Sequence, residues 1–335
     1  MILTRTPLRV SLLGGGSDYP AHFAHHGGAV LGMAIDKYVY VGVKRVPPGQ
    51  LMADKETGEP VPIRFRVQYS KVDDCQTADE IRHPAVRAAI RYLGLENDRL
   101  EFTTFADLPG RAGLGGSSSF VVGCLHALLR LKGERPSPAD LGREAIAFEQ
   151  FAVREAVGMQ DQIFAAFGGL NYVTFGAQSS ARAVDIPPER ITEMENSLVL
   201  VYTGAMRDAH IIAAKQIEAI GQNADDLDWL ALLAERGETL LRSRAHILGL
   251  GALLDHAWLY KRRFADVTSE GIDDLYRRGR RLGASGGKLL GAGGGGFMLF
   301  QVPPAERPEF EAQISAPCVR FKVAQEGSRI LIDEL

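Results

Sequence analysis

Residues 109–119 read PGRAGLGGSSS and lead directly into FVVGCLHALLRL, residues 120–131. Apolar residues recur after the loop with the spacing of a helix that buries one face, at Val121, Val122, Leu125, Leu128 and Leu129. The serines stand where this helix would begin, and serine is a good N-cap. Glycines let a ligand approach the backbone, and free amides at a helix N-terminus attract anions. The stretch therefore predicts a phosphate-binding loop; a loop that only turns a corner before a capped helix is the alternative.

This loop differs from the two common phosphate-binding patterns. The nearest approach to the Walker pattern, GGKLL at 286–290, lacks both the first glycine and the final Ser or Thr. One G-x-G-x-x-G occurs at Gly291, Gly293 and Gly296. It is followed by FMLFQV, which is typical of a strand, whereas a dinucleotide-binding fold requires a helix there.

Composition predicts an ordinary globular protein. The 335 residues are enough for two domains, and 46% hydrophobic with 24% charged residues is typical of a folded soluble chain. A net charge of −3 gives no general basic field for nucleic acid. No signal peptide or membrane-spanning run is visible, and Cys75, Cys124 and Cys318 form neither a zinc spacing nor a disulfide framework. We expect a cytoplasmic protein with no nucleic-acid or membrane partner; its oligomeric state is left open.

The first half of the chain predicts alternating strands and helices. Residues 1–13 form a strand in which Leu8, Val10 and Leu12 alternate with Arg9 and Ser11. The loop GGGSDYP follows at 14–20, where Asp18 either hydrogen-bonds sugar hydroxyls or caps a turn. The other expected elements are strands at 38–46 and 63–72, paired as a hairpin, strands at 101–109 and 170–175, and helices at 84–93, 117–131 and 138–157.

The second half predicts more helix. A strand at the start of 197–210 runs into a helix, and the expected helices cover 208–221, 226–246, 247–267 and 270–282. In KLLGAGGGGFMLF, 288–300, a glycine hinge leads into a strand, and its backbone must approach something closely, either the first loop or another strand. A short strand pair is expected around Glu326–Gly327.

Several charged residues are candidates for chemistry. Glu149 precedes Asp161 by 12 residues, and two carboxylates at one phosphate site can divide the work of holding Mg²⁺ and accepting a proton. For Glu149 the alternative is a solvated helix face. Arg207 either clamps an anion or lies on a helix surface. The histidines at 22, 25 and 26 are more typical of a loop or substrate edge than of a metal site.

Three stretches, in order, resemble the motifs of the GHMP kinase family: PLRVSLLGGGSDYP at 7–20, PGRAGLGGSSS at 109–119 and GAGGGGF at 291–297. Together they span almost the whole chain. The resemblance implies an α/β plus α+β, two-domain fold. A ribosomal-protein-S5-like N-terminal domain would cover 1–190, a ferredoxin-like C-terminal domain 191–335, and the active site would lie between them. It also implies an ATP- and Mg²⁺-dependent kinase.

The resemblance assigns roles to individual residues. The ATP phosphates would be bound by Pro109, Gly110, Gly113, Leu114, Gly115, Gly116, Ser117, Ser118 and Ser119. Mg²⁺ would be held by Glu149 and Ser117, with Ser118 kept because the register is open by one. Asp161 would be catalytic, with Arg9 positioning it and the acceptor. Substrate contacts would come from Gly15, Gly16, Ser17, Asp18, Arg207, Gly293 and Gly294.

One departure bears on the substrate. Galactokinases carry Glu-His-Thr-Asp where this chain has Gly15-Gly16-Ser17-Asp18, which removes two sugar contacts and leaves room for a larger sugar. The Gly-Gly form resembles the heptose 7-phosphate kinases and, less closely, fucokinases, which phosphorylate an anomeric hydroxyl. Arg207, in TGAMR, resembles their Thr-Gly-x-x-Arg stretch. The expected substrate is thus a phosphorylated sugar, heptose 7-phosphate. The alternatives are another sugar such as fucose, a decarboxylase of the mevalonate branch, or a non-catalytic sugar sensor. Retention of Glu149 argues against the decarboxylase, and intact Ser117, Glu149 and Asp161 argue against the sensor.

Overall fold

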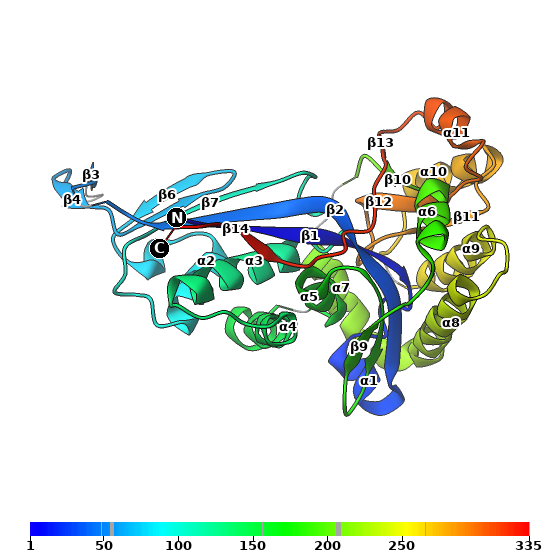
Figure 1. Cartoon of the computed structure of the whole chain (residues 1–335), viewed down its shortest axis with the longest axis horizontal. Coiled ribbons are helices and arrows are strands. Elements are labelled where there is room, and N and C mark those ends of the chain that lie inside the picture. Colours follow the sequence, from blue (N-terminus) through cyan, green and yellow to red (C-terminus); the bar gives the residue numbers. More distant parts are fainter. Residues whose placement is uncertain (48, 54–56, 156, 206–208, 265, 335) are drawn as a thin grey trace.

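The computed structural model describes residues 1–334 except 48, 54–56, 156, 206–208 and 265. The described chain is built on two sheets that lie at opposite ends of the molecule (Figure 1). The strands of the first half are β1 (Ile2–Leu13), β2 (Gly28–Arg45), β5 (Phe65–Gln68), β6 (Val72–Cys75), β7 (Leu100–Ala106), β8 (Leu170–Phe175) and β9 (Ser180–Ala183), with a small separate pair β3 (Leu51–Ala53) and β4 (Pro60–Pro62).

The first sheet is organised by the long strand β2. Its Val39–Arg45 portion pairs with β7, and its Gly28–Met33 portion pairs with β8, while β1 runs antiparallel along its other edge. The β1–β2 register shifts at Pro7/Leu8 and again between Ser11 and Leu13. Such bulges re-aim side chains and are where a strand tolerates proline. Arg9 and Ser11, which lie between these irregularities, are both buried and line the cavity described below.

Helices cover one face of this sheet, as Figure 1 shows for α2 to α5. The helical elements of the first half are α1 (Pro20–His26), the 3₁₀ turn η1 (Ala78–Glu80), α2 (Pro84–Tyr92), α3 (Gly116–Leu131), α4 (Pro138–Ala147), the π-helical η2 (Phe148–Val153) and α5 (Gln160–Phe167). Helix α3, which follows the phosphate loop, packs on β1 and β2 through buried residues including Val122, Leu125 and Leu129.

The second half carries a four-stranded antiparallel sheet in the order β11-β12-β10-β13. Its strands are β10 (Leu198–Tyr202), β11 (Gly286–Leu289), β12 (Phe297–Gln301) and β13 (Cys318–Val319). Its helical elements are α6 (Pro188–Ser197), α7 (Ala209–Glu218), η3 (Ile220–Gln222), α8 (Ala224–Arg242), α9 (Gly249–Lys261), α10 (Glu270–Arg281) and α11 (Arg307–Gln313). Helices separate β10 from β11, and β12 from β13, which gives the β-α-β-β-α-β connectivity of a ferredoxin-like unit.

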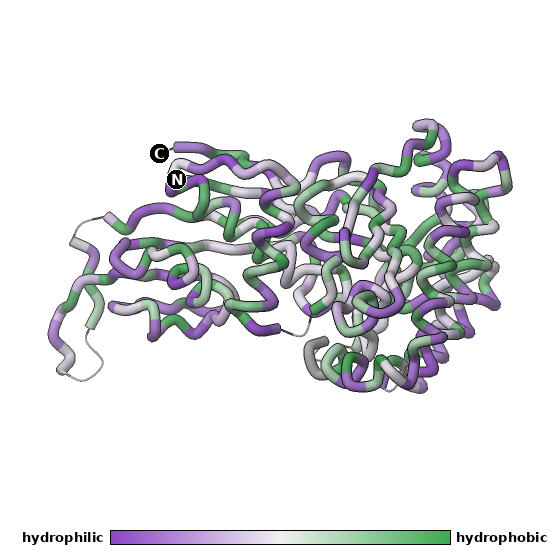
Figure 2. The backbone as a smooth tube through the Cα atoms, turned by 90° about the horizontal axis from the view of Figure 1, so that it is seen from below, coloured by the Kyte–Doolittle hydropathy of each residue, from purple (hydrophilic) through white to green (hydrophobic). Residues whose placement is uncertain are grey.

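The end of the chain returns to the first sheet. The last strand, β14 (Arg329–Asp333), pairs antiparallel with β1, and Val323 forms a bridge to Ile35. The two ends of the described chain therefore lie side by side in both Figure 1 and Figure 2. The expected division at residue 190 falls between β9 and β10, but the C-terminal segment belongs to the first sheet, so a single cut does not separate the two halves.

Most expected elements are confirmed, and three expectations are wrong. The strand 63–72 does not pair with 38–46: β5 runs parallel to β7, which occupies that edge of β2. The expected strand pair around Glu326–Gly327 is instead β14 on β1. The helix 138–157 ends early, because α4 passes into a π-helical turn at Phe148 and the chain leaves helical geometry at Arg154, which has φ +62°.

Hydrophobic and hydrophilic residues alternate along most elements instead of separating into blocks (Figure 2). One continuous core joins the two halves, with fully buried side chains from both, such as Phe65 and Phe148 in the first and Trp258 and Phe300 in the second. In the described part of the chain, no helix has the length and apolar character needed to cross a membrane.

Candidate active site

The phosphate loop connects β7 to α3, as expected, but its cap is a glycine. Gly115 is the N-cap of α3, with φ +72°, and no side chain caps the helix. The serines therefore do not cap α3; they lie within its first turn. The backbone preceding the helix has left-handed residues at Arg111 and Gly113 as well. Alternating left-handed residues turn successive N–H groups toward one side, and the first amides of a helix lack intrahelical partners. The loop has the geometry of an anion site.

The glycine-rich segment 291–296 supports this loop from behind. A Cβ on Gly291 would lie 2.5 Å from the Cα of Gly113, and one on Gly113 would lie 2.7 Å from the carbonyl oxygen of Leu290. The Phe297 amide donates to the Ala112 carbonyl at 3.1 Å. The close approach expected for the segment is thus to the first glycine loop, and only glycines leave enough space for the two backbones.

Gly291→Ala should displace the phosphate loop. Gly291 has φ +66°, and its Cβ would meet backbone that cannot turn away. We expect kcat/KM for ATP to fall by roughly tenfold or more, because a small displacement of a positioning loop is costly. Gly94→Ala is the matched control: Gly94 has φ +68° with nothing within 4 Å. It should cost only the backbone strain of about 1–2 kcal/mol, measured by thermal melting. Equal kinetics for the two variants would contradict the packing argument.

Arg9 and Asp161 form a two-pronged ion pair at the mouth of the loop. Arg9 Nε donates to Asp161 Oδ1 and Nη2 to Oδ2, both at 2.7 Å, while Nη1 donates to the Gly113 carbonyl at 2.6 Å. The β1 amide of Arg9 also donates to Leu114 O at 3.0 Å. One guanidinium thus fixes the phosphate loop and the carboxylate relative to each other. Asp161 lies in the first turn of α5, and its side chain is 24% exposed.

Glu149 lies behind Ser118, which lines the cavity, and is not itself among the described lining residues. Ser118 Oγ lies 3.0 Å from both Glu149 carboxylate oxygens, and Gln162 Nε2 also donates to the carboxylate. Glu149 is fully buried at the start of the π-helical turn, and burial raises its pKa to about 8. It is therefore not on a solvated helix face. The structure brings Ser118, which is buried, to Glu149, and leaves Ser117 exposed.

These residues fit the cofactors that the sequence predicts. Mg²⁺ prefers oxygen ligands and keeps several waters, so one carboxylate and one hydroxyl beside bound phosphates suffice. Glu149 and Ser118 supply both next to the first turn of α3. In metal-free protein the carboxyl holds its proton because it is buried, and a cation at this position would favour the ionised form. A buried acid that has no cationic partner among the described residues is the kind of group that a metal ion stabilises.

Asp18 organises the glycine loop at 14–20. Its carboxylate accepts from the Gly16 amide at 3.0 Å and from Gln160 Nε2 at 2.8 Å. It also accepts from the Gln160 amide at 3.3 Å, at the start of the helix that carries Asp161. Burial and the nearby Asp161 raise the pKa of Asp18. Ser17 is fully buried and bonds the Gly14 and Ala29 carbonyls, so it shapes the loop and does not face the cavity.

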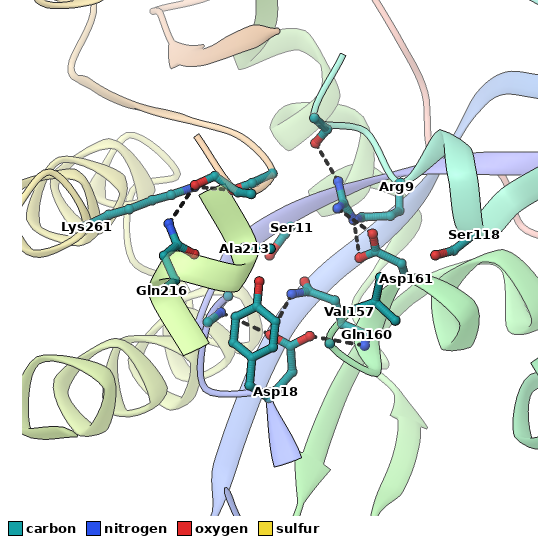
Figure 3. A pocket seen from close by; sticks show the side chains of 18 of the residues that line it. Arg9, Ser11, Asp18, Ser118, Val157, Gln160, Asp161, Ala213, Gln216 and Lys261 are labelled. Carbon is teal, nitrogen blue, oxygen red and sulfur yellow. Dashed lines mark hydrogen bonds and ion pairs between the residues drawn. The ribbon is translucent and has the colours of Figure 1, made fainter. Parts of the chain in front are cut away.

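The close-up in Figure 3 shows a cavity between the two halves, onto which these groups converge. Of the residues expected at the site, ten line it: Arg9, Gly15, Gly16, Asp18, Gly113, Gly115, Gly116, Ser117, Ser118 and Asp161. Among the described residues, eight of those expected at the site do not line it: Pro109, Gly110, Leu114, Ser119, Ser17, Glu149, Gly293 and Gly294. Ser119 instead donates to the Pro7 carbonyl at 2.8 Å, and Leu114 belongs to the core.

The third motif contributes different residues from those expected. Gly291 and Ala292 line the cavity, whereas Gly293 and Gly294 are not among the lining residues that the structure describes. The Gly294 amide donates to the Val267 carbonyl at 2.8 Å, and a Cβ on Gly293 would touch Val267. The geometry therefore does not support a substrate contact by Gly293 and Gly294, and their expected role stays a prediction. Arg207 lies outside the described residues, so its expected role stays a prediction.

Sequence reasoning missed two buried lysines that line the cavity. Lys288, in β11, donates to the Ser11 and Leu12 carbonyls of β1 at 3.0 and 2.9 Å and so joins the two halves. Lys261, at the end of α9, donates to the Leu289 carbonyl at 3.0 Å and to that of Gly291. Burial lowers the pKa of Lys288 to about 7 and that of Lys261 well below its usual value. The only sequence signal was a basic helix end and a lysine before the glycine run.

The histidines expected at a loop edge lie on α1 and face α8. His22 and His26 stack with ring centroids 5.0 Å apart. Asp228 lies 3.2 Å from His22 Nε2 and 3.3 Å from His26 Nδ1. They contribute to the contact between α1 and α8 and are not among the described residues that line the cavity.

Known proteins resemble this chain in sequence and in fold. The family model for the GHMP kinases N terminal domain matches residues 81–169. A D-glycero-alpha-D-manno-heptose 7-phosphate kinase of Campylobacter jejuni is 27% identical over 319 residues, which cover 91% of each chain. A bifunctional fucokinase/GDP-fucose pyrophosphorylase of Arabidopsis thaliana is also 27% identical, over 90% of this chain and 30% of its own length. The crystal structure of a D-glycero-D-manno-heptose 1-phosphate kinase from Bacteroides thetaiotaomicron superposes with a TM-score of 0.71, at 23% identity over 99% of each chain.

The family match covers the phosphate loop, Glu149 and Asp161, and the kinases matched in sequence and in fold extend the likeness over nearly the whole chain. The fold has the expected two parts, with the ferredoxin-like unit in the second half. The cavity joins an anion-binding loop to a carboxylate that can accept a proton, which is what phosphoryl transfer to an alcohol requires. The chain carries a GHMP kinases N terminal domain at residues 81–169 and resembles kinases of that family over nearly its whole length; it is an ATP-dependent phosphotransferase with an alcohol acceptor.

Proposed function

We propose that the protein transfers the γ-phosphoryl group of ATP to the anomeric C1 hydroxyl of D-glycero-D-manno-heptose 7-phosphate. The product would be the 1,7-bisphosphate, a precursor for nucleotide-activated heptose. The observation that carries the proposal is that the cavity connects the phosphate loop and Asp161 with the open Gly15-Gly16 loop. A kinase for a large sugar needs these two sites side by side.

The sugar site has room and hydrogen-bonding groups. Gly15 and Gly16 present no side chain to the cavity, and Asp18 holds their loop in place. Ser11 Oγ and Gln160 Oε1 are buried and have no hydrogen-bond partner within the described chain. Both residues line the cavity, and the hydroxyls of a sugar would satisfy such atoms.

The residues of the chain divide the chemistry. Asp161 would take the proton of the sugar hydroxyl as its oxygen forms a bond to the γ-phosphorus and the bond to the ADP oxygen breaks. Arg9 donates one hydrogen bond to each carboxylate oxygen of Asp161, and the remaining lone pairs of these oxygens can accept from the substrate. Ser118 and Glu149 would hold Mg²⁺, which when bound neutralises charge on the phosphates. The amides at the start of α3 would stabilise the charge that develops during transfer.

The names of the relatives support a sugar kinase and leave two acceptors in competition. The Campylobacter relative is named for heptose 7-phosphate and covers nearly its full length here. The Arabidopsis relative is named for fucose, so fucose is the second candidate acceptor. Heptose 7-phosphate is favoured because the relative named for it matches end to end, and because two buried lysines line the cavity.

The proposal is tested by ADP release with Mg-ATP over a panel of acceptors. The panel contains heptose 7-phosphate, heptose 1-phosphate, the neutral heptose, fucose, galactose, mannose and mevalonate. We expect heptose 7-phosphate to have the highest kcat/KM, by tenfold or more, which corresponds to about 1.4 kcal/mol. Phosphorus NMR of the product should show a new anomeric phosphate. Preference for fucose or another neutral sugar would keep the kinase and reject the heptose assignment.

A further inference from the structure

Two buried lysines line the cavity and have no part in the chemistry assigned above. Lys261 and Lys288 are 9% and 4% exposed. Within the described residues, their ammonium groups donate to backbone carbonyls. Asp18 acts on Lys261 electrostatically, but the hydrogen bonds of both ammonium groups within the described residues go to carbonyls. Burying a positive charge that is not hydrogen-bonded to a carboxylate costs free energy, and a bound anion offsets that cost. The cavity is therefore prepared for an anion at this end.

The two lysines differ in what they can still bind. Lys288 lies in β11, in the second half of the chain. Its ammonium group donates to the Ser11 and Leu12 carbonyls of β1, in the first half, so Lys288 joins the two halves. Lys261 lies at the end of a helix and contacts the glycine segment at Leu289 and Gly291. An ammonium has three N–H donors, so Lys261 keeps one for a ligand in the cavity.

A second observation points to a ligand at the same place. Ser11 Oγ is buried, lines the cavity and has no hydrogen-bond partner in the described part of the chain. In Figure 3, Ser11 lies between Lys261 on one side and Arg9 with Asp161 on the other. A ligand that extends from Asp161 toward Lys261 would pass this hydroxyl and satisfy it.

The position of Lys261 separates the transferred phosphoryl group from any second phosphate in the cavity. Figure 3 shows Lys261 and Gln216 on the side of the cavity opposite to Asp161 and Ser118. The transferred group must lie beside Asp161, so an anion at Lys261 is a different group. Burial, with repulsion from Lys288 and Arg9, lowers the pKa of Lys261, and a bound dianion would restore its charge.

We propose that Lys261 binds the phosphate that the acceptor already carries, remote from its reacting hydroxyl, and so selects phosphorylated over neutral sugars. The inference rests on the proposed function for the identity of the sugar. The contact between Lys261 and a phosphate does not depend on that identity, and it can be measured separately.

The first experiment compares heptose 7-phosphate with the same heptose lacking the phosphate. Lys261→Met should lower kcat/KM for the phosphorylated sugar by roughly 10- to 100-fold, the usual loss for a charged hydrogen bond. Turnover of the neutral sugar should change by less than threefold. Lys215→Met removes a lysine that is paired with Asp266 on the surface of α7, and should leave both values unchanged. An equal loss on both sugars would overturn the proposal, because it would indicate a purely structural tether to the glycine segment.

The second experiment measures the binding of inorganic phosphate by calorimetry with ADP present, so that the phosphate loop is filled. The wild-type protein should bind phosphate, and Lys261→Met should weaken this binding tenfold or more. Lys261→Gln keeps a donor for the Leu289 or Gly291 carbonyl without the charge, and serves if the Met variant fails to fold. Phosphate binding that is absent in the wild type, or equal in the variants, would overturn the proposal. If fucose is the preferred acceptor, the proposed function fails while this experiment still decides the role of Lys261.

Discussion

Asp161→Asn should lower kcat by roughly 10²- to 10⁴-fold, the range for loss of a positioned general base. Asparagine keeps the size of the side chain and one acceptor for Arg9, so one of the two hydrogen bonds from Arg9 is retained. Arg9 should therefore stay close to its place beside the phosphate loop. The amide cannot take the proton of the acceptor hydroxyl. ATP affinity, measured by calorimetry, should stay within about threefold, because Asp161 is not among the groups expected to hold the nucleotide.

The control for this variant is Asp140→Asn, which removes an exposed carboxylate near the start of α4. It should leave kcat unchanged while making the same change in net charge. Unchanged turnover in Asp161→Asn would remove the catalytic assignment. A parallel loss of ATP binding would instead assign Asp161 to the support of the phosphate loop through Arg9.

The sequence predicted the order of elements well because local signals encode them. Helix α2 has proline in its first turn, and β8 matches its expected bounds of 170–175. Strand partners were less predictable, since alternation marks a strand but not its neighbour. The chain after β5 crosses over through α2 and places β7 between β5 and β2. The return of β14 to β1 is a contact between the ends of the chain, which no local pattern records.

The site residues that lie within the sequence motifs could be predicted. Arg9, Asp161 and the phosphate loop lie together as the resemblance implied, and of the two serines kept as candidate metal ligands it is Ser118 that contacts Glu149. A helix turns by about 100° per residue, so Ser118 faces Glu149 whereas Ser117 is exposed at the cavity, and sequence spacing alone could not choose between them. The lysines were missed because their burial arises from packing between the two halves, and Lys261 is 27 residues from Lys288 along the chain.

Glu149→Gln should separate activity from stability. The substitution keeps the shape of the side chain and its contacts with Ser118 and Gln162, and removes the charge that would hold Mg²⁺. We expect kcat to fall by roughly 10²- to 10³-fold at fixed Mg²⁺, because charge stabilisation by the metal supplies several kcal/mol. Glu134→Gln, which changes an exposed glutamate in a loop, is the matched control and should leave kcat unchanged. Wild-type turnover in Glu149→Gln would exclude a metal-binding role.

Without metal, the same substitution that lowers kcat should make the protein more stable relative to the wild type as the pH rises. Burial raises the pKa of Glu149 to about 8 in the metal-free protein, from an ordinary value of 4.5. Between these values the folded state holds a proton that the unfolded state has released, so the contribution of Glu149 to stability falls as pH rises. Glutamine does not titrate, so the Tm of Glu149→Gln relative to wild type should increase from pH 5 to pH 8 without metal. Mg-ATP should counteract this trend, because it stabilises the wild type more than a variant that has lost the metal-binding carboxylate. A Tm difference that is independent of pH would show that the carboxyl is already ionised in the folded protein, and would remove the argument that a cation is needed to hold its charge.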